Sequence, residues 1–322
     1  MSLTVCITTQ EGIVLAADSR QSYKNIAGVA RIGSDSATKL FSVGEKVGVT
    51  VAGPAFFVDP SDKDKSPKGI NSYISAFLNK MNNEETVETI ATKLREYLEK
   101  IYNPTEQLKK LEPELERRVI EAGGRVVKKY QSQLGDAVLI DWIDKDSKPQ
   151  TAAAGIMPIS LIVAGYDMHT INKPELNMYV VNIPGLTRHV RKYGDKNQYG
   201  ASWTGQGDVL TRIIKGYDPS LHNLPFIQAA KQNLGESTIK QQLESLEYLV
   251  NWGVMTLRDA VDIAKLMIQT TIAIQRFSDG TKLVPGGMPG VGGPIDVAVI
   301  LPDEGFHWHQ KKALVLEKTN NL

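Results

Sequence analysis

Ser2 is the residue whose type and position in this sequence suggest chemistry. A strand is predicted to begin at Leu3, because residues 3–8 alternate apolar and small polar side chains, the pattern of a half-buried strand. We expect removal of Met1 to leave Ser2 with both a hydroxyl nucleophile and a free α-amine. Such an amine, whose ordinary pKa is about 7.7–8.0, can accept the proton of its own side chain. The alternative is that Ser2 is an ordinary second residue without a catalytic role.

A predicted β-hairpin would hold this residue in place. Residues 3–8 and 13–17 are both apolar runs, and a short polar turn joins them. A hairpin with a loop of about three to five residues places Asp18 opposite a residue between Ser2 and Thr4. The sequence therefore predicts a carboxylate near the first residues of the chain.

A second predicted hairpin brings a lysine near a glycine. Residues 38–43 and 47–52 are strand-like and are separated by a Gly-Glu-Lys turn. In this hairpin Lys39 lies opposite or diagonal to Val51, and thus close to Gly53.

The rest of the chain alternates between groups of strands and groups of helices. Apolar spacing predicts helices over 69–81, 86–102 and 256–276, the last with a capping box at its start, and one or two more within 106–134. This order predicts two packed sheets with helices outside. Further strands are expected at 138–143, 160–164, 178–183, 199–204 and 295–301, whereas 21–36, 145–158 and 184–197 are expected to lack regular structure.

Composition excludes several classes of protein. The net charge of +1 gives no indication of a nucleic-acid partner, and the five His and single Cys show no zinc-ligand spacing. Cys6 has no internal disulfide partner, which fits a reducing, cytoplasmic compartment. No apolar run approaches the roughly 20 residues of a membrane helix. We expect no metal, no cofactor and no membrane contact.

Short segments spread over the whole chain occur in a recognisable order. They are Thr4-Val5, Gly12 to Arg20, Lys39-Leu40-Phe41, Val49 to Gly53, Leu161 to Asp167, Ala201 to Gly207, Gln275-Arg276 and Gly292 to Ile300. In this order they resemble proteasome β-type subunits and bacterial proteasome-like peptidases, which are N-terminal nucleophile hydrolases.

The resemblance implies an α+β fold, a four-layer α-β-β-α sandwich of two antiparallel sheets with helical and loop insertions. It implies a single proteasome-like domain over residues 1–322. Because typical members are shorter, the extra length near 103–157, 218–250 and 277–291 is interpreted as insertions. It also implies self-assembly into a ring or other homo-oligomer, while an ATPase partner cannot be inferred.

The resemblance assigns roles to four residues. Ser2 stands where the family has its N-terminal threonine nucleophile, and Asp18 and Lys39 match its buried acid and lysine. A nearby ammonium lowers the pKa of an amine or hydroxyl. Gly53 matches the glycine whose backbone N–H forms the oxyanion hole.

The sequence departs from the family at the far side of this site. Gln206 lies in a turn that usually carries a serine, Phe277 replaces an aspartate, and Val291 replaces another serine. Asp279, two residues later than the expected position, is a candidate for the missing acid. Substrate contacts are expected at Val51, Ala55 and Gln206.

These observations support a proteasome-like N-terminal serine amidohydrolase, with Ser2 as nucleophile and a peptide or protein as substrate. The departures at Gln206, Phe277 and Val291 support a rival interpretation, a catalytically inactive ring or scaffold subunit. A non-peptide amidase or a transpeptidase on the same fold are further alternatives.

Overall fold

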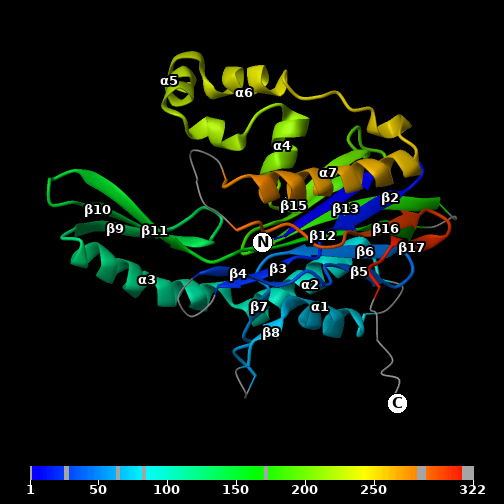
Figure 1. Ribbon diagram of the computed structural model, residues 1–322, viewed down its shortest axis with the longest axis horizontal. Coiled ribbons are helices and arrows are strands. Elements are labelled where there is room, and N and C mark those ends of the chain that lie inside the picture. Colours follow the sequence, from blue (N-terminus) through cyan, green and yellow to red (C-terminus); the bar gives the residue numbers. More distant parts are fainter. Residues whose placement is uncertain are drawn as a thin grey trace. The chain divides into compact units, whose positions relative to one another are not determined.

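Antiparallel sheets and flanking helices build this chain (Figure 1). The computed structural model describes residues 2–24, 29–62, 66–81, 85–169, 173–280 and 288–313. The strand pairings whose residue register is described are all antiparallel, and the mixture of such sheets with helices confirms the predicted α+β class. The chain divides into two compact units. Unit 1 comprises Met1–Leu40, Tyr199–Leu301 and His307–Leu322, and unit 2 comprises Phe41–Gln198 and Pro302–Phe306.

The N-terminal strand lies inside the sheet of unit 1. The strand order is β15-β1-β2-β16-β17, so β1 has a hydrogen-bonded neighbour on each side. Thr4 pairs with Ala17 on one side and with Thr204 on the other. The strands are β1 (Leu3–Thr8), β2 (Ile13–Ala17), β15 (Gly200–Gly205), β16 (Asp296–Leu301) and β17 (Gly305–Gln310).

All six residues of β1 are buried, so the prediction of a half-buried strand was wrong. The alternating pattern gave the wrong burial for β1 because its polar side chains form hydrogen bonds inside the protein. The Thr4 hydroxyl lies 2.8 Å from the Thr204 hydroxyl, and the Thr8 hydroxyl donates to the Gly200 carbonyl at 3.3 Å. A buried polar group that is hydrogen-bonded avoids most of the cost of leaving water.

Helix α7 (Leu257–Phe277) packs on this sheet (Figure 1). Its start is a capping box, as predicted: the Thr256 hydroxyl accepts from the Asp259 N–H, and the Asp259 carboxylate accepts from the Thr256 N–H. Its buried face carries small and apolar residues, among them Ala264 and Ile268, which join the cluster around β1 and β2. The other elements of unit 1 are β3 (Gln21–Lys24), β4 (Ala30–Ser34), α4 (Asp208–Lys215), η1 (Pro219–Asn223), α5 (Pro225–Leu234), α6 (Glu236–Glu244) and η2 (Trp252–Val254).

Unit 2 contains a second five-stranded sheet, in the order β14-β13-β12-β6-β5. Side chains from this sheet and from two helices form one hydrophobic cluster, which includes Val51, Leu94 and Leu161. The elements are β5 (Leu40–Val43), β6 (Val47–Ala52), β12 (Ile159–His169), β13 (Lys173–Ile183), β14 (Thr187–Lys192), α1 (Ile70–Leu78) and α2 (Val87–Tyr102).

A smaller sheet in unit 2 packs against one helix. Its order is β11-β10-β9, and its apolar residues cluster with Leu108 and Leu115 of helix α3. The elements are α3 (Pro104–Glu121), β9 (Arg125–Gln131), β10 (Ala137–Ile143) and β11 (Pro149–Gly155). A separate short pair, β7 (Phe56–Phe57) with β8 (Lys68–Gly69), precedes helix α1 in the sequence.

Three segments expected to lack regular structure contain strands. Residues 21–36 hold the β3–β4 hairpin, 145–158 hold β11, and 184–197 hold β14. Helices were predicted within 106–134, but the later part of this region contains strand β9 (Arg125–Gln131). Most residues of these strands are exposed or only partly buried, so their sequences lack the apolar alternation on which the prediction relied.

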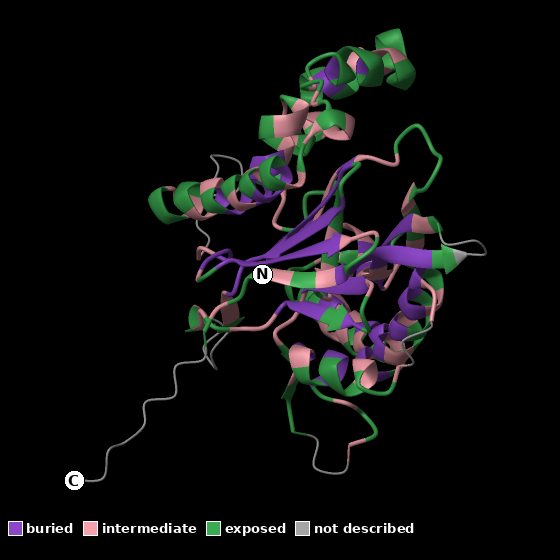
Figure 2. Cartoon of the chain, turned by 90° about the vertical axis from the view of Figure 1, so that its right-hand side faces the viewer, coloured by how far each residue is buried: buried purple, intermediate pink, exposed green. Residues whose placement is uncertain are grey.

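Figure 2 shows that the buried residues concentrate in the strands, while the helices turn exposed sides outward. Among the described residues, no helix combines the length and apolar content needed to span a membrane.

Candidate active site

The first hairpin brings Asp18 to the start of β1. The Asp18 N–H donates to the Leu3 carbonyl at 3.2 Å, and the Leu3 N–H donates to Asp18 Oδ1 at 2.9 Å. This confirms the predicted register, in which Asp18 lies opposite a residue between Ser2 and Thr4. Ser2 itself, the residue before the strand, is 5% exposed.

The Asp18 carboxylate is buried and accepts four hydrogen bonds. Oδ1 accepts from the Leu3 N–H and from Lys39 Nζ, the latter at 2.7 Å. Oδ2 accepts from the Arg20 N–H at 3.1 Å and from the Gly292 N–H at 2.9 Å. Because Asp18 is 1% exposed, these donors take the place of water around the charge.

Lys39 is held between this carboxylate and the backbone. Its Nζ donates to Asp18 Oδ1 and to the Arg20 carbonyl, and its side chain is 7% exposed. Burial lowers the pKa of Lys39 below its ordinary value of 10.5, and the Asp18 carboxylate opposes that change by charge and hydrogen bonding. The result is a buried ammonium that loses its proton more readily than a lysine in water.

Gln206 links Ser2 to the end of helix α7. The Gln206 N–H donates to the Ser2 carbonyl at 2.8 Å, and Gln206 Oε1 accepts from Gln275 Nε2 at 3.1 Å. Gln275 Oε1 in turn accepts from the N–H groups of Gly290 and Val291, each at 2.9 Å. The substituted position Gln206 is thus part of a polar connection.

These contacts close a ring of hydrogen bonds around the start of the chain. The ring runs from Ser2 through Gln206 and Gln275 to residues 290–292, and the Gly292 N–H returns it to Asp18. A Cβ on Gly292 would lie 2.3 Å from the Arg20 guanidinium carbon, so a side chain there would displace Arg20. The absence of a side chain at this position therefore leaves the space that the Arg20 guanidinium occupies.

Arg20 forms an ion pair beside this ring. Its Nε and Nη2 donate to the two carboxylate oxygens of Asp35, at 2.7 and 2.9 Å. This hydrogen bonding raises the pKa of Arg20 and lowers that of Asp35. The pair places Arg20 in a structural role, next to the residues that hold Asp18.

The remaining candidates lie in different surroundings. Asp279 is exposed, two residues beyond the end of helix α7, and Phe277 is 81% exposed. Gly53, in unit 2, packs tightly on its own sheet, because a Cβ there would lie 3.1 Å from the Ile159 Cα atom. Val51 is buried in the core of unit 2, and the Ala55 carbonyl accepts from the Ile70 N–H at 3.1 Å, at the start of helix α1.

Sequence reasoning missed the contribution of Gln275. The signal was a polar residue on the apolar face of a helix: Gln275 follows Ile268 and Thr271, both fully buried, at helical spacing. A glutamine on that face needs internal partners, and it finds them in Gln206 and in the backbone of residues 290 and 291.

No protein-family model matches this chain, and no curated protein sequence matches it. Among solved structures, a similar chain is one titled Anbu (Gly-1) mutant from Hyphomicrobium sp. strain MC1. It is 13% identical, the match covers 97% of this chain and 86% of that chain, and the TM-score is 0.44.

Proposed function

We propose that this protein is an N-terminal serine amidohydrolase that acts on peptides. Ser2, freed by removal of Met1, is the nucleophile, and its α-amine is the general base. The observation that carries the proposal is the arrangement of Asp18 and Lys39 next to Ser2. The Leu3 N–H and Lys39 Nζ bind the same carboxylate oxygen, at 2.9 and 2.7 Å. Because both groups bind the same oxygen, the distance from Lys39 Nζ to the Leu3 nitrogen cannot exceed the sum of these two distances.

A cation at that position supports the chemistry in two ways. It disfavours protonation of a nearby amine, so the Ser2 α-amine is kept in its basic form, and it lowers the pKa of a nearby hydroxyl. Asp18, itself held by three backbone N–H groups, stabilises the charged form of Lys39 through the hydrogen bond from Lys39 Nζ.

The reaction proceeds in two steps. The Ser2 hydroxyl attacks the substrate carbonyl while the α-amine accepts its proton, and the amine then passes this proton to the leaving nitrogen. The resulting ester is hydrolysed by water, which the same amine deprotonates. If a second amine attacks the ester in place of water, the site performs transpeptidation.

Other parts of the proposal rest on the sequence resemblance. They are Gly53 as oxyanion donor, Val51, Ala55 and Gln206 as substrate contacts, and Asp279 as a further acid. The resemblance also supports a four-layer sandwich made as one domain with insertions, and self-assembly into a ring or other homo-oligomer. The proposed cytoplasmic location rests on the single cysteine, which has no internal disulfide partner.

An inactive ring or scaffold subunit is the second candidate. The observations that favour it are the exposed position of Asp279 and the use of Gln206 in a purely amide network with Gln275. This candidate predicts no covalent labelling of Ser2 and no functional loss in Ser2→Ala.

The mature N-terminus and a trapping reagent test the proposal. Mass analysis of the purified protein should show Met1 absent. A peptide epoxyketone, which reacts with a hydroxyl and an adjacent amine, should label Ser2. Ser2→Thr keeps both groups and should be labelled, whereas Ser2→Ala should not. Retention of Met1, or equal labelling of Ser2→Ala, would refute the mechanism.

A further inference from the structure

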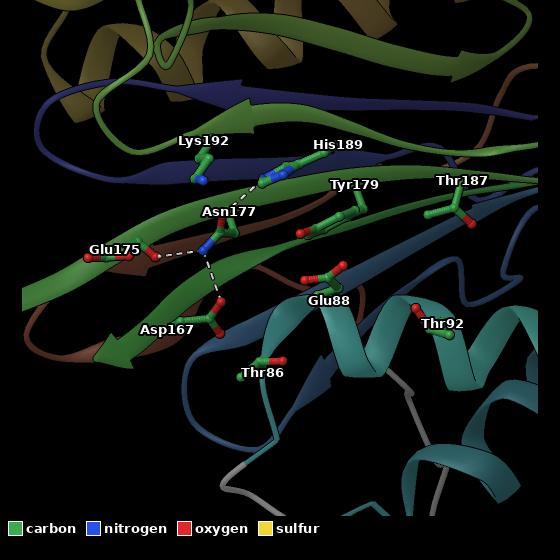
Figure 3. Close-up of a pocket in the computed structure, with 10 residues that line it drawn as sticks. All are labelled: Thr86, Glu88, Thr92, Asp167, Glu175, Asn177, Tyr179, Thr187, His189 and Lys192. Carbon is green, nitrogen blue, oxygen red and sulfur yellow. Dashed lines mark hydrogen bonds between the residues drawn. The ribbon is translucent and has the colours of Figure 1, made fainter. Parts of the chain in front are cut away.

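A polar cavity lies in unit 2, formed by residues that the proposed hydrolase chemistry does not use. It has a volume of about 560 Å³ and is lined by the first turns of helix α2 and by strands β12, β13 and β14 (Figure 3). A volume of this size accommodates a small organic molecule.

Two buried polar side chains form a fixed framework in this cavity. Asp167 and Asn177 are 7% and 8% exposed. Asp167 Oδ1 accepts from the Val87 N–H at 2.8 Å, which anchors the first residue of α2, and Oδ2 accepts from Asn177 Nδ2 at 2.9 Å. Since the Asn177 amide nitrogen faces Asp167, its oxygen faces His189, and His189 Nε2 must donate the 2.9 Å hydrogen bond between them. The framework is therefore rigid and internally satisfied (Figure 3).

Around this framework the cavity is rich in acceptors, one of which, the Glu88 carboxylate, accepts a hydrogen bond from the Tyr179 hydroxyl. Among the described residues, the carboxylates of Glu88 and Glu175 form no ion pair. The Thr187 hydroxyl oxygen is buried and, in the described part of the chain, has no hydrogen-bond partner. With Asp167, the lining carries three carboxylates against one ammonium, that of Lys192.

An aromatic wall completes the cavity. The ring of Tyr179 stacks on that of His189 with centroids 4.2 Å apart and planes 13° from parallel. Burial first, and then the charges of Glu88 and Asp167, raise the pKa of Tyr179 to about 12. The charges of Glu88 and Asp167, which contribute to this shift after burial, favour a positive charge in the same place.

We propose that this cavity binds a small organic cation whose head is a guanidinium or primary ammonium group. The carboxylates of Glu88 and Glu175 accept hydrogen bonds from the head. An anion would meet an excess of negative charge. A bare metal ion does not fit either, since no group of three or more metal-ligating side chains gathers anywhere in the described ranges.

The test compares a charged probe with a neutral molecule of the same shape. Isothermal titration calorimetry of the full chain with n-butylguanidinium should give saturable binding to one site, while n-butylurea should not bind. Glu88→Gln and Glu175→Gln keep the side-chain shape but remove a charge-assisted hydrogen bond, and each should weaken binding about tenfold.

Glu96→Gln is the matched control, because Glu96 is an exposed glutamate on the same helix that does not line the cavity. Its affinity for n-butylguanidinium should equal that of the wild type. Absence of saturable binding would overturn the proposal. So would equal binding of n-butylurea, or affinity unchanged by Glu88→Gln and Glu175→Gln. Ser2→Ala should bind the cation normally, which separates this proposal from that for the hydrolase.

Discussion

Replacement of Asp18 by Asn tests the role of the buried carboxylate. The change keeps the size of the side chain but turns one oxygen, which accepts two hydrogen bonds, into an NH₂ group that faces two donors. It also leaves the Lys39 ammonium buried without its counter-charge. Removal of one partner from a buried ion pair costs about 3–5 kcal/mol, so we expect a loss of this size in the free energy of unfolding.

The pH dependence of that loss follows from the pKa of Lys39. Burial lowers this pKa below 10.5, so between the lowered value and 10.5 the unfolded chain binds more protons than the folded chain. The free energy of unfolding therefore rises with pH in that window. Asp18 raises the pKa of Lys39, so its removal lowers it further. The difference between the wild type and Asp18→Asn should accordingly shrink as the pH rises from 7 toward 10.5.

Urea unfolding followed by circular dichroism at several pH values measures both effects. Asp35→Asn is the control, because the Asp35 side chain is 43% exposed and its pair with Arg20 should contribute no more than about 1 kcal/mol. A loss below about 1 kcal/mol for Asp18→Asn, or a difference that grows with pH, would refute the reasoning.

Three other substitutions probe the surrounding structure. Gln275→Ala removes three hydrogen bonds, so it should lower the free energy of unfolding by about 2–3 kcal/mol and speed hydrogen exchange at the Gly290 and Val291 N–H groups. The control Gln269→Ala changes an exposed glutamine of the same helix and should alter neither quantity. Gly165→Ala would place a Cβ 2.3 Å from the Lys46 carbonyl oxygen, so it should destabilise by at least about 1–3 kcal/mol, and an unchanged melting temperature would contradict this packing. Thr256→Ala removes the cap of helix α7 and should cost about 1 kcal/mol in urea unfolding, with no loss expected if the capping box is absent in solution.

Local patterns in the sequence were sufficient for the first hairpin and for helix α7. A tight turn limits which residues face each other, so the position of Asp18 opposite a residue between Ser2 and Thr4 followed from the spacing, and the structure places it opposite Leu3. The start of α7 was likewise predicted from Thr256 and Asp259, because a capping box needs only neighbours in sequence.

Features that depend on distant partners were not predictable in the same way. Strand β14 was missed because its residues are exposed or partly buried, and its pairing with β13 is what makes it a strand. The contacts of Gln275 depend on a loop that returns to the helix 15 residues later. The cavity in unit 2 depends on Glu175, Asn177 and Tyr179, polar residues at alternate positions of one strand, which face helix α2 only after folding.

The central position of β1 also constrains the order of events during synthesis. Its partner β2 follows within ten residues, but its other partner, β15, ends at Gly205. Until about two hundred residues have left the ribosome, one edge of β1 therefore stays unpaired. Under the proposed mechanism an aminopeptidase would have to act before β15 pairs with β1, because Ser2 is buried in the finished structure.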